Sequence, residues 1–310
     1  SKHGIKKAVA DTTSGFLLSD VTSNIGCIAS DSVLEIGGDL VFLAPDGIRP
    51  VSGTDKIGDV QLESISKPAQ LMITALTQSS PELSLNGVVV RSKSQFRYFI
   101  GNDTSAVPDS VGIIGGLRDT STSYTSAGYV SNGWEFGQLQ GIRTSCVTSR
   151  YVGSQELVLH GDYDGCVYQQ EVGESFNGAT IVSVYSTPYL DFGEPDIRKV
   201  FDKINVFSRG EGTLIMGLRV DYDWGAQEAA ARNPQQYVLT IDASQVQYDE
   251  SGVTYGGANE VYGGILARRT LADIQGSFFS TRLTFTTGDA TSASFSIHAA
   301  ILEFSFKGRR

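Results

Sequence analysis

Paired carboxylates are the first residues in this sequence that could do chemistry. Asp221 and Asp223 alternate along one stretch, and Asp162 and Asp164 flank a single tyrosine. A glycosidase needs two carboxyl groups about 5 to 10 Å apart, with one of them protonated. Asp164 precedes Gly165, however, and Asp-Gly is typical of a hairpin turn. Asp221 and Asp223 lie opposite an apolar stripe, where a solvated surface is the ordinary interpretation, so we expect neither pair to be catalytic.

Other patterns that could bind a nucleophile, a phosphate or a metal are weaker. The sequence has no Gly-x-Ser-x-Gly motif, and residues 112–116 lack the lysine of a phosphate-binding loop, which predicts a strand end and turn there. Residues 102–133 are rich in Ser, Thr and Asp but lack EF-hand spacing, which favours a solvated insertion over a calcium site. The aspartates of that stretch are Asp103, Asp109 and Asp119. We therefore predict no catalytic residue, no metal and no cofactor.

Cysteine and histidine are too few to build a metal centre with ease. The cysteines are Cys27, Cys146 and Cys166, and the histidines are His3, His160 and His298. The odd cysteine count without a Cys-x-x-Cys motif predicts buried small hydrophobic residues in a protein made in a reducing compartment.

Tryptophan and tyrosine side chains could form a sugar-binding shelf, a subunit interface or part of a core. Trp224 continues an apolar stripe, which predicts that it lies in a core. Tyr248, Tyr255 and Tyr262 are spaced by seven among Gly and Asn, which favours a loop at an interface. The other candidates for such a shelf are Trp134, Tyr124, Tyr129, Tyr222 and Tyr237.

The elements that would carry these residues are mostly strands. Every second residue from Leu214 to Trp224 is apolar, which predicts a strand with one face on a core. A similar strand is predicted over residues 278–286, and residues 295–306 are apolar on both faces, which predicts a strand covered on both sides. Residues 67–76 predict a short helix, and residues 227–232 either a helical turn or an alanine-rich surface loop.

The first half of the chain repeats a pattern of short strands and tight turns. The pattern occurs at residues 32–51 and 151–168, with a weaker copy at 88–100. Its apolar strands lie near Phe42, Tyr98 and Leu159, so the spacing is 56 to 61 residues. Such a period is typical of propeller blades.

Two prolines and a glycine within residues 187–195 indicate a change of structure after the repeats. We therefore predict an all-β protein with two domains. Residues 1–185 would form a partial or complete β-propeller, and residues 186–310 a β-sandwich or jelly-roll-like domain.

The charge balance limits the partners of this protein. The 310 residues include 24 Lys and Arg against 34 Asp and Glu, a formal net charge of −10 at pH 7. This argues against a protein held to nucleic acid by a basic surface. The basic clusters at residues 6–7, 268–269 and 309–310 are expected to be solvated ends. Because no apolar run approaches about 18 residues, we expect no membrane-spanning segment.

Three separated segments resemble, in the same order, the tail nozzle family, also called tail tubular protein B, of T7-like short-tailed bacteriophages (podoviruses). The first covers residues 25–33 (IGCIASDSV) and 38–48 (GDLVFLAPDGI). The second covers residues 187–195 (TPYLDFGEP) with Arg198, Lys199 and Phe201. The third is looser and covers residues 294–298 (SFSIH), Glu303 and 308–310 (GRR).

The resemblance implies a structural protein and not an enzyme. It implies a hexameric, ring-shaped channel at the tail tip of the virion, which is made in the host cytoplasm and passes genomic DNA without sequence-specific binding. It further implies tail adaptor and tail fibre proteins as neighbours. Residues 102–133 and 225–236 are then candidates for loops that gate the lumen. The acidic composition agrees, because a channel for DNA should not bind phosphate. The alternative is a carbohydrate-binding or glycoside-hydrolysing protein of propeller and sandwich architecture.

Overall fold

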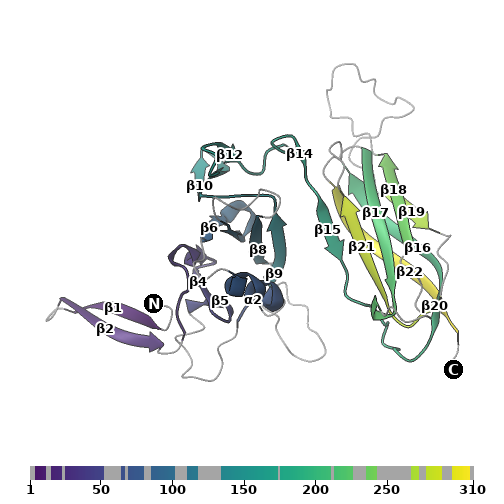
Figure 1. Cartoon of the computed structure of the whole chain (residues 1–310), viewed down its shortest axis with the longest axis horizontal. Helices are drawn as coiled ribbons and strands as arrows, with labels where there is room; N and C mark the ends of the chain where they lie inside the picture. The colour runs from purple at the N-terminus through teal and green to yellow at the C-terminus, as the bar shows by residue number, and fades with distance from the viewer. Residues whose placement is uncertain are drawn as a thin grey trace, which may run out of the picture. The chain divides into compact units, whose positions relative to one another are not determined.

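The chain folds almost entirely into β-strands. The computed structural model describes residues 4–11, 15–22, 25–51, 64–66, 69–79, 85–101, 110–117, 134–173, 175–210, 213–225, 235–242, 267–271, 277–287 and 295–307. Within these ranges the strands form antiparallel sheets, accompanied by the helix α2 (Gln70–Ser79) (Figure 1). The prediction of an all-β protein is confirmed, and α2 overlaps the helix predicted at residues 67–76. Residues 227–232 lie outside the described residues.

Two compact units divide the chain, Ser1–Val172 and Gly173–Arg310. The division falls earlier than the expected boundary between residues 185 and 186. Strand β15 (Ser183–Ser186) pairs with β21 (Thr281–Thr287), and this pairing ties the segment before residue 186 to the second unit. The Pro-rich segment at 187–195 is therefore a connection inside the second unit.

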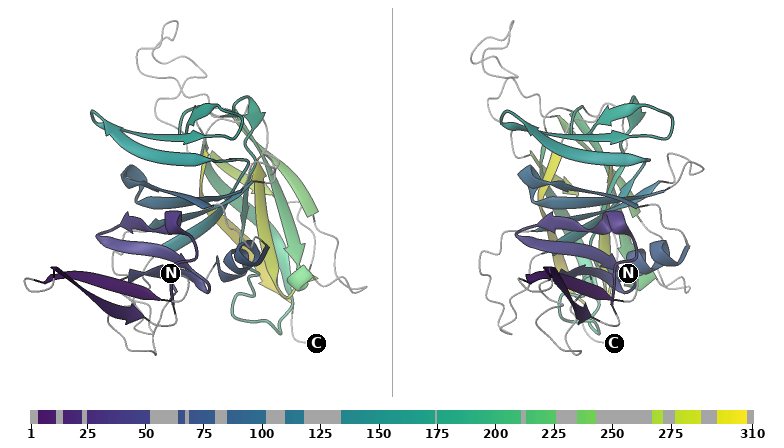
Figure 2. Two further views of the ribbon diagram at one scale, coloured as in Figure 1. Left: turned by 60° about the vertical axis from the view of Figure 1, so that its left-hand side comes forward. Right: turned by 90° about the vertical axis from the view of Figure 1, so that its left-hand side faces the viewer.

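Three successive antiparallel meanders build most of the first unit, and both views of Figure 2 show them one above the other. The first is β3 (Leu34–Ile36), β4 (Asp39–Ala44) and β5 (Gly47–Pro50). The second is β6 (Leu85–Val90), β7 (Gln95–Ile100), β8 (Val111–Leu117) and β9 (Trp134–Gln140). The third is β10 (Cys146–Val152), β11 (Gln155–Gly161) and β12 (Val167–Gln169). Each predicted repeat lies in one meander, and its apolar strand is β4, β7 or β11.

The second meander is buried on both faces because its side chains alternate between two cores. Val89 and Phe96 pack with Leu43 of the first meander, and Ile73 of α2 joins the same cluster. Val88, Val90 and Phe99 point the other way and pack with Val158 of the third meander. Successive strand residues point to opposite faces, so adjacent valines of β6 serve different cores. The three meanders thus form a continuous stack.

Residues 112–116 lie inside β8, so the prediction of a strand end and turn there is wrong. Tyr98 and Phe96 of the neighbouring strand β7 approach the backbone of β8 closely. A Cβ added at Gly112 would lie 2.6 Å from the carbonyl oxygen of Tyr98, and one at Gly115 would overlap the ring of Phe96. These glycines are therefore packing residues. Strand β8 also shows that the stretch 102–133 is not one continuous solvated insertion.

Two antiparallel sheets enclose the core of the second unit. One has the order β15–β21–β17 (Thr213–Tyr222)–β18 (Gln235–Asp242). In the other, β16 (Lys199–Gly210) pairs with β22 (Phe295–Phe306) along one edge. Its other edge pairs with β19 (Ala267–Leu271) and β20 (Ser277–Phe278) at different points along the strand. The inner faces share one buried cluster: Phe201, Ile204, Val206, Met216, Leu218, Val220, Tyr222, Leu239, Phe278, Leu283 and Phe285. The strand predicted at 214–224 is confirmed as far as Tyr222, and the strand predicted at 278–286 is confirmed from Thr281 as β21, whereas Phe278 belongs to β20 of the other sheet. A small hairpin, β13 (Ser175–Phe176) and β14 (Ala179–Thr180), precedes them.

Strand β22 is covered on one face, which corrects the expectation of cover on both. Its residues Ile297, Ala300, Leu302 and Phe304 pack against the core. Ile301, in contrast, is 48% exposed. Among the described residues β22 pairs with β16, so its other edge is open.

Strands β1 (Ile5–Asp11) and β2 (Gly15–Thr22) form an antiparallel hairpin at the start of the described chain. The hairpin is a two-stranded sheet of its own, which no other described strand joins. Lys6 of the basic cluster at 6–7 lies on β1 and forms an exposed ion pair with Asp20 of β2, at 3.3 Å. This cluster is therefore part of a regular element.

Candidate functional site

The Asp162 and Asp164 pair belongs to a hairpin turn, as the sequence predicts. Gly165 has a φ of +80° and donates its backbone N–H to the carbonyl oxygen of Asp162 at 3.2 Å. Arg143 bonds both carboxylates, with Nε 2.6 Å from Asp162 and Nη2 2.7 Å from Asp164. The hydrogen bond from Arg143 holds the pKa of Asp162 below its ordinary value. Neither carboxyl is placed to be the protonated acid of a glycosidase.

Asp221 is buried, which corrects the expectation of a solvated surface. Its side chain accepts from Arg219 Nε at 2.7 Å and from Arg282 Nη2 at 2.8 Å. Burial alone would raise the pKa of this carboxyl, but hydrogen bonds from Arg282 and Arg219 outweigh it and lower the pKa. Asp221 is therefore an ionised tie between the neighbouring strands β17 and β21.

Asp223 does not share a strand face with Asp221, because β17 ends at Tyr222. It opens the short 3-10 turn η5 (Asp223–Gly225), and its Oδ1 accepts the backbone N–H of Phe279 at 2.6 Å. The two carboxylates thus serve two separate structural purposes. No carboxylate pair predicted from the sequence offers both an acid and a free base.

Trp224 is 53% exposed, so the prediction that it lies in the core is wrong. The turn has three consecutive residues of positive φ: Asp223 at +50°, Trp224 at +54° and Gly225 at +72°. This backbone turns the indole away from the stripe that β17 follows. The backbone N–H of Trp224 donates to Ser280 Oγ at 3.1 Å, and this bond helps to hold the turn. Non-glycine residues in this region are strained, and such strain is common at binding sites.

The remaining aromatic candidates do not form a shelf in the described residues. Trp134 packs on Phe96, with ring centroids 5.6 Å apart. Tyr222 is buried in the core of the second unit, and Tyr237 packs against that core. Tyr124, Tyr129, Tyr248, Tyr255 and Tyr262 lie outside the described residues.

Lys199, the first residue of β16, is a fully buried cation. Its Nζ donates to three backbone carbonyls, those of Glu194 at 2.5 Å, Ile197 at 3.1 Å and Phe279 at 3.1 Å. Burial lowers its pKa, although nearby carboxylates act in the opposite direction. Phe192 of the connection at 187–195 packs at a tilt against Phe304, with ring centroids 4.5 Å apart. The segment therefore closes one end of the core.

Glu156 joins the second and third meanders of the first unit. Its carboxylate accepts the backbone N–H groups of Arg91 at 3.0 Å and Ser92 at 2.7 Å, and the hydroxyl of Ser149 at 2.5 Å. Burial opposes ionisation, but these bonds outweigh it and lower the pKa of Glu156 to about 2. No residue close in sequence indicates this contact, because Glu156 and Ser92 are 64 residues apart.

A second tie between the same meanders centres on Arg97 of β7, which is nearly buried. Its Nη1 donates to Gln170 Oε1 at 2.9 Å, and its Nη2 pairs with Glu171. Lys93 pairs with the same glutamate. Glu171 thus neutralises two basic side chains of its own unit, Lys93 and Arg97.

The cysteines and histidines give no metal centre in the described part of the chain. Cys146 and Cys166 are free and exposed, which corrects the expectation of buried cysteines, and Cys27 is partly buried. His160 stacks on Tyr168, and burial lowers its pKa. No group of three possible ligands occurs among the described residues. Asp103, Asp109, Asp119 and His3 lie outside them.

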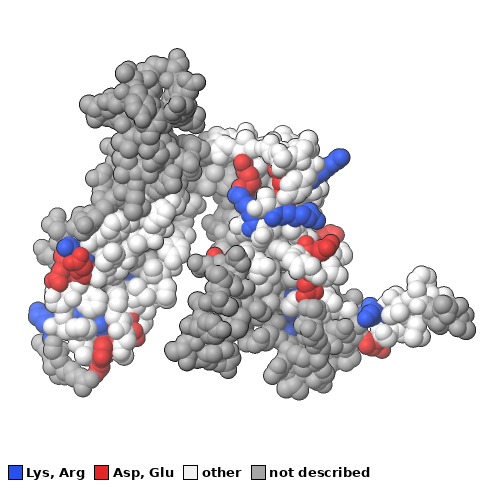
Figure 3. All heavy atoms as spheres, turned by 180° about the vertical axis from the view of Figure 1, so that it is seen from behind, with Lys and Arg blue, Asp and Glu red and all other residues white. Residues whose placement is uncertain are grey.

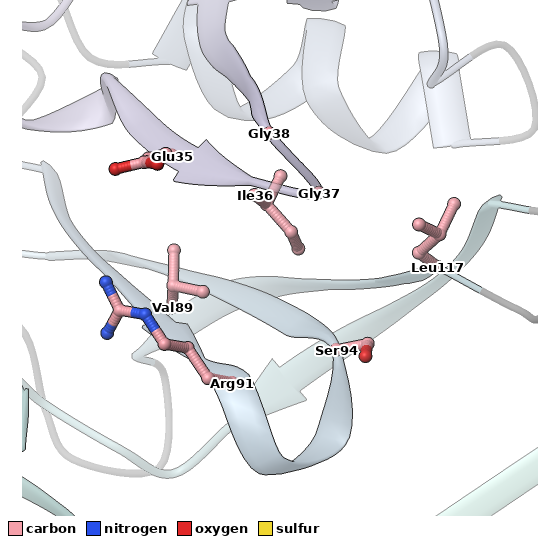
Figure 4. A pocket seen from close by; sticks show the side chains of 8 residues that line it. All are labelled: Glu35, Ile36, Gly37, Gly38, Val89, Arg91, Ser94 and Leu117. Carbon is pink, nitrogen blue, oxygen red and sulfur yellow. The ribbon is translucent and has the colours of Figure 1, made fainter. Parts of the chain in front are cut away.

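A shallow hollow of about 260 Å³ lies where the turn between β3 and β4 faces β6 and the end of β8. Figure 4 shows Glu35 and Arg91 on one side of it and Leu117 on the other, with Ile36 and Val89 between them. The lining carries a single carboxylate. Two-carboxylate hydrolysis is therefore not assembled in this hollow.

Larger apolar surfaces occur at the edges of the sheets. The described hairpin exposes Phe16, Leu17 and Leu18, which are 75%, 59% and 66% exposed. In the second unit an apolar groove of about 450 Å³ lies between strands of the two sheets. On the face in Figure 3, basic and acidic side chains of the described residues lie side by side without a continuous basic strip. The surface features thus suit protein contacts better than phosphate contacts.

No known protein family matches this chain, and a search of curated protein sequences also gives no match. In the described residues, no helix has both the length and the apolar character needed to cross a bilayer.

Proposed function

We propose that this chain is a structural subunit of a bacteriophage tail nozzle, a ring-shaped channel that retains DNA and then passes it during ejection. One contrast in the described residues carries the proposal. The charged groups that could do chemistry are bonded into the fold, whereas large apolar side chains are exposed on the β1–β2 hairpin and at sheet edges. This arrangement suits an assembling subunit better than an enzyme. The three ordered segments of family resemblance supply the kind of assembly.

The stacked meanders support the finer fold that this function implies. We interpret the three meanders as successive blades of a partial β-propeller, because each is an antiparallel sheet packed face to face on the next. The two sheets around one core in the second unit correspond to a β-sandwich or jelly-roll-like domain. In both kinds of module, function depends on the surface loops and the sheet edges.

The charges of the chain support a channel that does not retain DNA. Net charge is −10, and Arg97, Arg143, Arg219 and Arg282 are each paired with a carboxylate of their own unit. Paired guanidinium groups are poor phosphate ligands, because only an unpaired cationic side chain can displace the counterions that surround DNA. In this proposal the protein is made in the host cytoplasm and sits at the tail tip. There it contacts a tail adaptor and tail fibres, while loops within 102–133 or 225–236 gate the lumen.

Negative-stain imaging of the purified chain tests this proposal. We expect ring-shaped particles of six-fold symmetry with a central hole, and no retention of duplex DNA at physiological salt. A uniform monomer that hydrolyses glycosides would contradict the proposal.

A carbohydrate-binding protein is the second candidate, and one observation favours it. Trp224 is exposed on a fixed turn, and Arg282 stacks 4.8 Å over the ring of Tyr189 near that turn. A glycan array tests this directly. Binding that is lost in Trp224→Ala but kept in Phe306→Ala, which also removes an exposed aromatic, would support this candidate. An array without binding would remove it.

A further inference from the structure

The β1–β2 hairpin has an apolar face that no described part of the chain covers. Antiparallel pairing places Leu18 opposite Ala8 and Phe16 opposite Ala10, so these four side chains share one face. Phe16 and Leu18 are 75% and 66% exposed. An isolated two-stranded hairpin is marginally stable in water, and a third strand or an apolar cover stabilises it. The hairpin therefore has the properties of a docking element.

The second unit carries a groove of matching character. It lies between β15 and β21 of one sheet and β22 of the other, with a volume of about 450 Å³. Its lining is Tyr185, Thr187, Leu190, Leu283, Phe285, Ile297, His298, Ala299, Ala300 and Leu302. Four consecutive residues of β22 contribute to it, so the groove follows the backbone edge of that strand and not only one face. An open strand edge beside an apolar slot is the geometry that accepts an added strand.

We propose that this groove binds the β1–β2 hairpin of a second copy of this chain. Phe16 and Leu18 enter the slot, and the hairpin backbone pairs with the open edge of β22. Strand β22 has 12 residues, so it is long enough for residues 16–19 of β2 to pair with it. This inference rests on the proposed function in one respect, that the chain assembles with itself.

The two surfaces match in that neither brings a charged side chain to the proposed contact. The lining contains no Asp, Glu, Lys or Arg. The central part of the hairpin, residues 8–10 and 16–19, is equally uncharged. The exposed ion pair between Lys6 and Asp20 lies beyond this part and stays in water. Docking therefore buries no unpaired charge, which a stable interface requires.

A second copy is the occupant that fits the assembly best. The hairpin and the groove are different surfaces, and each copy carries one of each. Such heterologous contacts link subunits head to tail and close into a ring when the rotation per subunit permits. A ring is the assembly that the proposed function needs.

The hairpin test compares its two faces. Phe16→Ser with Leu18→Ser removes the face that enters the groove. Val9→Ser with Leu17→Ser removes the opposite apolar face of the same hairpin, and serves as the matched control. We expect the first double variant to associate about 100-fold more weakly, since two large apolar side chains lose their burial. The control should assemble as the unchanged chain does. Circular dichroism checks that both variants are folded.

The groove test uses two exposed positions of β22. Ala299→Glu places a charge in the lining, and Ser296→Glu places the same charge on β22 outside it. Only the first should reduce assembly. Equal behaviour of the two variants would overturn the proposal.

Cross-linking identifies the occupant. One chain carries Leu18→Cys and a differently tagged chain carries Ala299→Cys, with the exposed Cys146 and Cys166 replaced by serine in both. A short bis-maleimide should link the two tags. A third chain carries both Leu18→Cys and Ala299→Cys. If cross-links form only within this chain and not between the two tagged chains, the proposal is overturned.

The outcomes separate this inference from the proposed function. If the unchanged chain forms rings and the Phe16→Ser, Leu18→Ser variant forms them equally well, this inference fails and the nozzle proposal stands. If the unchanged chain is a monomer at every concentration and the Leu18→Cys and Ala299→Cys chains give no cross-link, both fail.

Discussion

Charged residues that are bonded into the fold act as ties between segments that are far apart in sequence. Asp221 is held by Arg282, Glu156 by the backbone of residues 91 and 92, and Lys199 by three carbonyl groups. Each of these groups is ionisable, so the sequence alone makes each a candidate for chemistry. In the structure their hydrogen bonds are already used. Their substitution should therefore change stability before it changes any activity.

Replacing Lys199 with methionine should destabilise the second unit by about 3 kcal/mol. The substitution leaves three partly buried carbonyl oxygens without their donor, and an unsatisfied polar group away from water is costly. Chemical denaturation followed by tryptophan fluorescence measures the change. Lys203→Met on the same strand is the control, because Lys203 is partly exposed and pairs with Glu303 at 3.0 Å. It should cost less than about 1 kcal/mol. Equal losses would contradict the tie assigned to Lys199.

The contribution of Glu156 to stability should depend on pH. Its pKa is about 2 in the folded chain against an ordinary value of 4.5. The unfolded chain therefore takes up the proton first as the pH falls. The stabilisation is present above about pH 4.5 and is lost as the pH falls toward 2. Glu156→Gln should be less stable than the unchanged chain by about 1 kcal/mol at pH 7. The difference should vanish near pH 2, and a constant difference across the range would contradict this.

Sequence reasoning at the residue scale located the buried apolar faces but not the ties. Alternation correctly marks Met216, Leu218 and Val220 as core, because burial of one strand face is a local property. Asp221 is buried on the face that alternation assigns to solvent, because it pairs with Arg282, which is 61 residues away in the sequence. Trp224 breaks the alternation because the backbone leaves the strand one residue earlier, at Asp223.

Strand β8 shows why an element can be hidden in a sequence. Glycine is rare in strands, so residues 112–116 suggest a turn. In the structure the ring of Phe96 occupies the space where a Cβ of Gly115 would lie. The glycines of this strand are therefore required by a neighbour on β7, which no local pattern reveals. In contrast, the turns and strands of 32–51 and 151–168 were predictable, since Gly-Gly and Asp-Gly mark hairpins locally.

Gly115→Ala should destabilise the first unit by about 2 kcal/mol. The added methyl group overlaps Phe96, which is fully buried and cannot move aside without disturbing its core. Gly116→Ala is the matched control one residue further along the strand. Its Cβ would meet Gln95 Cγ at an ordinary 3.6 Å, so this variant should be unchanged or slightly more stable. Thermal unfolding of both variants measures the difference, and equal midpoints would contradict the packing assigned to Gly115.

At the scale of the whole molecule, the sequence predicted the all-β class because alternation and turn residues are dense throughout the chain. The sequence predicts a division between residues 185 and 186, whereas the compact units meet between residues 172 and 173, because a proline-containing connection resembles a linker even when it closes a core. Assembly is the property that local patterns reveal least. It depends on which apolar faces remain open after folding, and in the described part of the chain these include the hairpin, the groove and the edge of β22.

Native mass spectrometry of the unchanged chain over a range of concentrations tests the central claim most directly. The account predicts a particle of six copies of the 33.2 kDa chain, which dissociates on dilution into smaller multiples. A single species of 33.2 kDa at every concentration would contradict it.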